Sequence, residues 1–213
     1  MASSLVLEHR AQHENPVSNP KGHPMTTSDL TASHASATSQ PNASAGGERA
    51  DLLATLAQCR HFLRLTTRDL TDDQARERTT VSELCLGGLI KHVTSAEQGW
   101  VDFILEGPSA LGSVTDMTEE DYARRADEFR LLPGETLAGV LAAYAEVAQR
   151  TDEVVASLPS LDDGHPLPEA PWFEPNTRWS ARRVLLHIMA ETTQHAGHAD
   201  IIREAIDGAK SMG

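Results

Sequence analysis

The first 48 residues of this chain lack aromatic side chains altogether. The whole sequence of 213 residues contains only three Trp, two Tyr and four Phe, and all of them lie at Phe62 or later. The leading segment is instead rich in Ser, Thr, Ala and Gly. A segment of this composition buries too little apolar surface to offset the entropy lost on ordering. We therefore expect residues 1–48 to form a disordered tail and residues 49–213 to form one folded domain.

Long apolar runs and cysteines are also scarce. No run is long enough to span a bilayer, and the amino-terminal segment has no unbroken apolar stretch behind a basic start. The two cysteines, Cys59 and Cys85, are too few for a disulfide framework. These features predict a cytoplasmic protein with no membrane partner, in which each cysteine is a small buried residue.

Basic residues are outnumbered by acidic ones. The chain has 18 Lys and Arg against 31 Asp and Glu, which gives a formal net charge of −13 at pH 7. An acidic surface repels phosphate backbones, so nucleic acid is not an expected partner.

From Arg49 onward the apolar residues recur with a helical period, and no run alternates well enough to predict a strand. Four amphipathic helices of this length predict an all-α fold, a four-helix bundle. The connections 107–133 and 159–179 are long enough for an overhand crossover, and a short helix is expected near Thr118–Arg125. The four predicted helices are 50–69, 80–106 opened by a capping box at Thr80–Glu83, 135–158, and 181–206 with Ser180 as N-cap and Gly208 as its stop.

The stretch HIMAETTQHAGHAD, residues 187–200, carries three histidines and a glutamate on the last predicted helix. A turn of 100° per residue points His195 close to the bundle axis and Glu191 to the inner edge, with His187 and His198 on the flank. Glu191 and His195 are four residues apart and so lie one turn apart on one face. This spacing can chelate one cation.

A third ligand has to come from another part of the chain, and the candidates are His61, His92 and His165. His92, in GGLIKHVTSAEQGW, lies at the edge of the buried face of the second predicted helix. The spacing alone leaves a second interpretation open, a partly solvated histidine cluster stabilised by a Glu/His pair. Neither cysteine and no serine lies in a nucleophile motif.

Two stretches of the sequence resemble a known family. SELCLGGLIKHVTSAEQGWVDFILEG and RWSARRVLLHIMAETTQHAGHADIIREAIDG are similar to the DinB-like superfamily, and within it to the actinobacterial branch of uncharacterised mini-circle protein domains. The resemblance covers about Arg49–Gly208. It implies a four-helix bundle with a long crossover, and a divalent metal held by His92, Glu191 and His195. The related mycothiol-dependent maleylpyruvate isomerases and mycothiol S-transferases also use a His, Glu, His set, whereas other relatives have three histidines.

This ligand set implies a function. Three protein ligands leave one position open, as in catalytic zinc sites, where a thiol would be held as a thiolate nucleophile. The resemblance thus implies a metal-dependent thiol (mycothiol) S-transferase or isomerase acting on a small electrophile. We expect Zn²⁺, although Ni²⁺, Fe²⁺ and Mn²⁺ also suit these ligands.

Two other functions stay open: a non-catalytic metal-binding or dimerising protein, and a metal-dependent hydrolase. In the first, His187 or His198 would close the metal's coordination shell; otherwise these two are surface or outer-shell residues. The apolar stripes of the first and third helices predict a homodimer.

Overall fold

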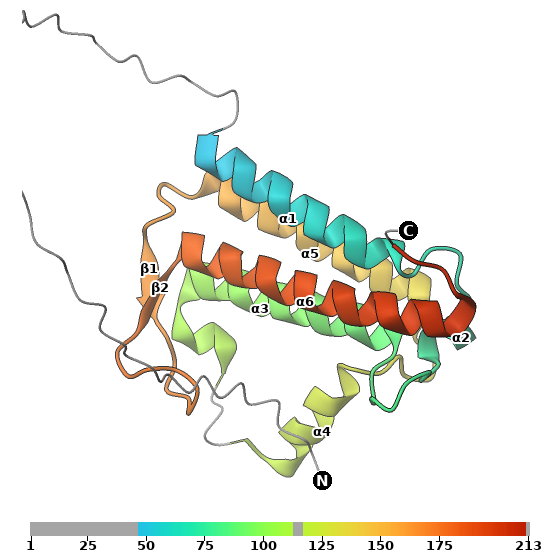
Figure 1. The fold of residues 1–213 in the computed structure, drawn as a ribbon. Coiled ribbons are helices and arrows are strands. Elements are labelled where there is room, and N and C mark those ends of the chain that lie inside the picture. The colour runs from blue at the N-terminus through green and yellow to red at the C-terminus, as the bar shows by residue number, and fades with distance from the viewer. Residues whose placement is uncertain (1–46, 113–116, 212–213) are drawn as a thin grey trace, which may run out of the picture. The chain divides into compact units, whose positions relative to one another are not determined.

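Four long helices form the body of this protein in a computed structural model that describes residues 47–112 and 117–211 (Figure 1). The long helices are α1 (Gly47–Leu65), α3 (Leu86–Glu106), α5 (Leu137–Ser157) and α6 (Ala181–Asp207). The connections hold α2 (Asp72–Arg76), the 3₁₀ helix η1 (Pro108–Leu111), α4 (Glu119–Asp127), and the antiparallel strands β1 (Gly164–Pro166) and β2 (Arg178–Ser180). The predicted all-α four-helix bundle is confirmed. The predicted tail, residues 1–48, lies outside the described residues except for Gly47 and Glu48, which begin α1.

The long helices follow the order α1, α6, α3, α5 around the bundle. Helix α1 packs on α6, α6 on α3, and α3 on α5, as Figure 1 shows. Of the three consecutive pairs of long helices, α1 with α3 and α5 with α6 therefore lie on diagonals, whereas α3 and α5 are neighbours. The connection 159–179 between α5 and α6 thus crosses an end of the bundle, which confirms a crossover in one of the two predicted places.

Helices α1 and α6 run in the same direction. The buried Arg203, near the end of α6, donates hydrogen bonds to the carbonyls of Thr66 and Arg68 just past the end of α1, at 2.9 and 2.6 Å. At the other end of the bundle, Arg49 of α1 donates to the Val155 carbonyl near the end of α5 at 2.6 Å. Arginine side chains thus satisfy carbonyls that the ends of these helices leave without partners.

Several predicted helix ends are confirmed. The Ser180 hydroxyl accepts the Arg183 N–H at 3.2 Å and begins α6, and Gly208 ends it with a left-handed φ of 76°. The short helix predicted near residue 118 is α4, where Thr118 and Asp121 form a capping box.

The predicted start of the second helix at Thr80 is wrong, because α3 begins at Leu86. The Thr80 hydroxyl accepts the Ser82 N–H at 3.2 Å, and Glu83 pairs with Arg78, so the Thr-x-x-Glu pattern forms a local turn and not a cap. The strands β1 and β2 and the short helix α2 were not predicted, since elements of three to five residues are too short to show a period.

The helices show no membrane-spanning character, and the cysteines are both free thiols. None of the described helices is both long and apolar enough to cross a membrane. Cys85 is buried, as predicted. Cys59 is only half-buried because it lies at the edge of the α1–α6 interface, where the Thr193 hydroxyl is 3.3 Å from its sulfur.

Ion pairs around the buried Arg60 join three of the long helices. Arg60 of α1 is 6% exposed and Glu97 of α3 is 1% exposed, and the Arg60 Nε donates to Glu97 at 3.2 Å. Arg60 also donates to Asp152 of α5 at 2.9 Å, and the Thr151 hydroxyl donates to Glu97 at 2.6 Å. Burial lowers the pKa of Arg60, but the hydrogen bonds and charges of Glu97 and Asp152 outweigh it and raise the pKa above its usual value. The core therefore contains a charged arginine whose partners all come from other helices.

We expect Glu97→Ala to lower the free energy of unfolding by about 3–5 kcal/mol, because it leaves the buried Arg60 without its main partner. Urea denaturation of the wild type and the variant measures the difference. The control is Asp102→Ala, which breaks the more exposed pair with Arg150 and is expected to cost about 1 kcal/mol or less. Equal losses in the two variants would contradict a special role for the buried pair.

Candidate metal centre

Three potential metal ligands meet where α3 packs on α6. His92 comes from α3, and Glu191 and His195 come from successive turns of α6. One ligand atom from each residue lies within 4.8 Å of the other two, and among the described residues this is the one such group of three or more His, Cys, Asp or Glu side chains. Helical spacing predicted Glu191 and His195, and the family resemblance implied His92 as the third ligand.

The distances in this triad, His92, Glu191 and His195, suit a single small cation. The His195 Nε2 lies 3.5 Å from a Glu191 carboxylate oxygen, and the two imidazole centroids are 4.8 Å apart. Two atoms bound to one tetrahedral metal at 2.0–2.1 Å would lie about 3.4 Å apart. Two imidazoles and one carboxylate form a donor set that divalent transition metals accept. The residues present therefore fit a divalent metal ion.

The carboxylate of the triad is held in its charged form. The hydrogen bond with His195 keeps the pKa of Glu191 below its usual value, and this effect outweighs the burial that would raise it. The Glu191 side chain is 30% exposed, whereas that of His195 is 12% exposed. An ionised carboxylate between imidazoles is ready to bind a cation without first losing a proton.

His187 lies beside the triad but belongs to an aromatic cluster. Its ring packs edge-on against Trp100 and Trp179, with centroids 4.7 and 5.0 Å away, and the two indoles stack on each other at 4.9 Å. Its Nε2 is 3.9 Å from Glu191, and burial lowers its pKa. His187 therefore forms part of an aromatic wall next to the carboxylate.

His198 lies beside the Nδ1 atom of His195, whereas Glu191 lies beside its Nε2 atom. The two Nδ1 atoms are 3.5 Å apart, so the Nε2 of His195 is left to face Glu191. Neither His187 nor His198 belongs to the group of atoms that could share one metal. The sequence prediction that both flank the triad agrees with these positions.

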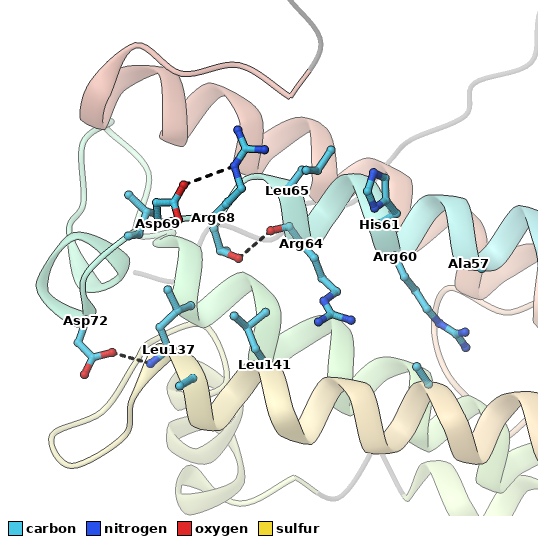
Figure 2. A pocket seen from close by; sticks show the side chains of 14 residues that line it. Ala57, Arg60, His61, Arg64, Leu65, Arg68, Asp69, Asp72, Leu137 and Leu141 are labelled. Carbon is cyan, nitrogen blue, oxygen red and sulfur yellow. Dashed lines mark hydrogen bonds and ion pairs between the residues drawn. The ribbon is translucent and has the colours of Figure 1, made fainter.

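The other two candidate ligands lie elsewhere. His165, on β1, has its Nε2 3.2 Å from the Ile104 carbonyl and its ring against Phe103. His61 is exposed on α1 and lines a groove of about 740 Å³ between α1 and α5, together with Arg64 and Leu141 (Figure 2). This groove runs along the edge of the bundle opposite the α3–α6 contact, so it is separate from the candidate metal centre.

Sequence reasoning missed the segment that covers His92. The ring of Phe129, just after α4, stacks on the His92 ring with centroids 4.1 Å apart and planes at 25°. A Cβ on Gly88, one turn before His92, would lie 1.9 Å from the Phe129 carbonyl oxygen. Only glycine at this position lets the backbone of the segment reach α3, and the Gly-Gly pair before His92 was the available signal.

Lys91 attaches the segment around Phe129 to α3 by hydrogen bonds. Its ammonium group donates to the carbonyls of Asp127 and Arg130, at 3.2 and 3.0 Å, and to both carboxylate oxygens of Glu135 at 2.8 and 2.7 Å. The two carbonyls lie on either side of Glu128 and Phe129 in the chain. The side chain next to His92 thus holds the segment that packs on His92.

The helix order, the crossover connections and the His/Glu/His triad define a DinB-like helical bundle with a possible metal site. Within this class, the model of the mycothiol-S-transferase family matches residues 51–208. The chain therefore belongs to the mycothiol-S-transferase family. No curated protein matches the sequence.

We expect Gly88→Ala to destabilise the fold by about 1–3 kcal/mol, because its methyl group would overlap the Phe129 backbone. The matched control is Gly99→Ala on the same helix, where the nearest atom to a new Cβ is 3.9 Å away. That variant is expected to stabilise α3 by about 0.5–1 kcal/mol. Thermal unfolding followed by circular dichroism measures both changes. A stabilised Gly88→Ala variant would show that the segment does not pack on α3 as described.

We expect the Lys91–Glu135 interaction to make stability depend on pH. Burial raises the pKa of Glu135, but hydrogen bonds from Lys91 and the Leu132 N–H lower it more, so it lies below its usual value. The interaction therefore contributes stability above the unfolded carboxyl pKa of about 4.3, and this is lost as pH falls through the lower folded value. Melting temperatures between pH 7 and pH 3 should fall more steeply for the wild type than for Glu135→Gln.

The control for this pH series is Glu146→Gln, which removes an exposed carboxylate from α5. Its melting temperature should follow the wild-type curve. A Glu135→Gln curve parallel to the wild type would contradict the expected contribution of Glu135.

Proposed function

We propose that this protein is a metal-dependent S-transferase that joins mycothiol to a small electrophile, with His92, Glu191 and His195 as ligands of a Zn²⁺ ion. The observation that carries the proposal is the meeting of these three side chains, from two helices, in a member of the mycothiol-S-transferase family. An isomerase that uses the same thiol is the nearest variant of this function.

A divalent ion at this site would lower the pKa of a thiol that joins it, which supplies a nucleophile at neutral pH. The protein's own residues would prepare the position. Glu191 is ionised, and His195 directs its Nε2 toward that carboxylate. Three protein ligands leave a position for the thiol sulfur.

Aromatic side chains border the triad on two sides. Phe129 stacks on His92, and Trp100 with Trp179 packs against His187 next to Glu191. Such walls limit the access of water, which strengthens electrostatic interactions in the site. They also suit an electrophile with an apolar body.

The two alternatives make different demands on the same residues. A structural metal site needs a fourth protein ligand, and among the described residues no fourth histidine, cysteine or acid joins the triad. A hydrolase would use the open position for water. The family match supports a thiol as the occupant of that position. The homodimer predicted from the sequence stays a prediction.

Metal analysis of the purified full-length protein is the first test. We expect about one divalent ion per wild-type chain, and a loss of affinity of more than about 100-fold in His92→Ala and in His195→Ala, since each removes a direct ligand. The control is His61→Ala, which makes the same change at an exposed position on α1. Equal metal content in all four proteins would rule out the site.

The activity needs a separate assay, because fold and metal do not specify a reaction. Mycothiol and, for comparison, N-acetylcysteine should be mixed with a panel of electrophiles: an aryl halide, an epoxide and an unsaturated ketone. We expect conjugation that prefers mycothiol and stops when the metal is chelated. A metal-loaded protein that conjugates none of these electrophiles, but hydrolyses ester or amide substrates, would support the hydrolase instead.

A further inference from the structure

The His92 ring has one nitrogen without a partner. Its Nδ1 is buried and makes no hydrogen bond to any described residue. A buried ring nitrogen in this state is unfavourable, so a nearby acceptor or donor is expected. The nearest carboxylate is that of Glu128, whose Oε2 lies 3.8 Å from the Nδ1 atom.

The position of Glu128 bears on which nitrogen of His92 is free to bind a metal. Glu128 does not belong to the group of ligand atoms formed by His92, Glu191 and His195. Its carboxylate lies closest to Nδ1, so a hydrogen bond from Nδ1–H to Glu128 would leave Nε2 as the nitrogen available to a metal. His195 is arranged in the same way, with its Nε2 toward Glu191 and its Nδ1 toward His198.

The backbone that carries Glu128 is held firmly against α3. Lys91 binds the carbonyls on both sides of it, those of Asp127 and Arg130, and Phe129 stacks on the His92 ring. Glu128 is the C-cap residue of α4, and its side chain is 37% exposed. A fixed backbone with an adjustable side chain allows the carboxylate to move the distance of about 1 Å that a hydrogen bond requires.

We propose that Glu128 is a positioning residue of the metal centre: its carboxylate accepts the Nδ1–H of His92 and so fixes Nε2 as the nitrogen that binds the metal. A histidine ligand binds through the nitrogen that its other hydrogen bond leaves free, and a carboxylate partner makes the imidazole a stronger donor to the metal. The inference rests on the proposed function to the extent that His92 is a ligand.

Metal affinity tests the proposal. The dissociation constant for Zn²⁺ should be measured by competition with a chromogenic chelator for the full-length wild type, Glu128→Ala, Glu128→Gln and Glu120→Gln. Loss of a carboxylate partner of a ligating histidine weakens metal binding about 10- to 100-fold, which is the loss expected for Glu128→Ala. Glu128→Gln keeps an acceptor oxygen and should lose less.

Glu120→Gln is the matched control, because it removes the same charge from an exposed position on α4. Its affinity should equal that of the wild type. Circular dichroism should show the same melting curve for the metal-free forms of all four proteins, so that a loss of affinity is not a loss of fold.

The second measurement reports the nitrogen directly. In ¹⁵N-labelled, zinc-loaded wild type, the His92 ring should show a metal-bound Nε2 and an Nδ1–H proton that exchanges slowly with water, with the signals assigned by their absence from His92→Gln. In Glu128→Ala this proton should exchange quickly. A purely structural role of Glu128 would leave the exchange unchanged.

Two results would overturn the inference and leave the proposed function intact: equal zinc affinity in Glu128→Ala and wild type, or zinc bound through Nδ1 of His92. A wild type that binds no zinc would overturn both. The three outcomes are thus distinguishable in one set of samples.

Discussion

The packing of α3 on α6 is the constraint on which the candidate site depends. Glu191 and His195 lie one turn apart on α6, so their spacing follows from the helix alone. His92 joins them only because α3 lies along the same face. Two candidate ligands on one rigid helix and a third on its neighbour give a site whose geometry is set by the core of the bundle, in which side chains have little freedom to shift.

The connection between α3 and α5 packs against His92 and so forms part of the surroundings of this site. Gly88 admits the Phe129 backbone, Lys91 binds the carbonyls around it, and the Phe129 ring covers His92. Gly88, Lys91 and the candidate ligand His92, all in one stretch of α3, thus contact the same segment. A long connection of this kind is expected to be functional, and here it supplies the surroundings of a candidate ligand.

Much of this arrangement could be predicted from the sequence. The helical period predicted the four long helices, Ser180 and Gly208 marked the ends of α6, and the wheel of α6 directed Glu191 and His195 inward. The start of α3 was predicted five or six residues too early, because the hydroxyl of Thr80 bonds to the second amide after it in a turn. Local hydrogen bonds compete for such side chains, and the sequence does not show which partner wins.

The sequence by itself determined the long helices, the periodic burial of their faces and the spacing of the two candidate ligands on α6, since these depend on residues close together in the chain. Only the tertiary structure decided the rest. It places His92 beside the pair, where helical spacing had left His61, His92 and His165 open and only the family resemblance implied His92, and it places Glu128 and Phe129 against His92. These contacts join residues about 36 to 103 positions apart, and their distances depend on how whole helices pack. Helical spacing carries no information at that range, because it repeats within a single element.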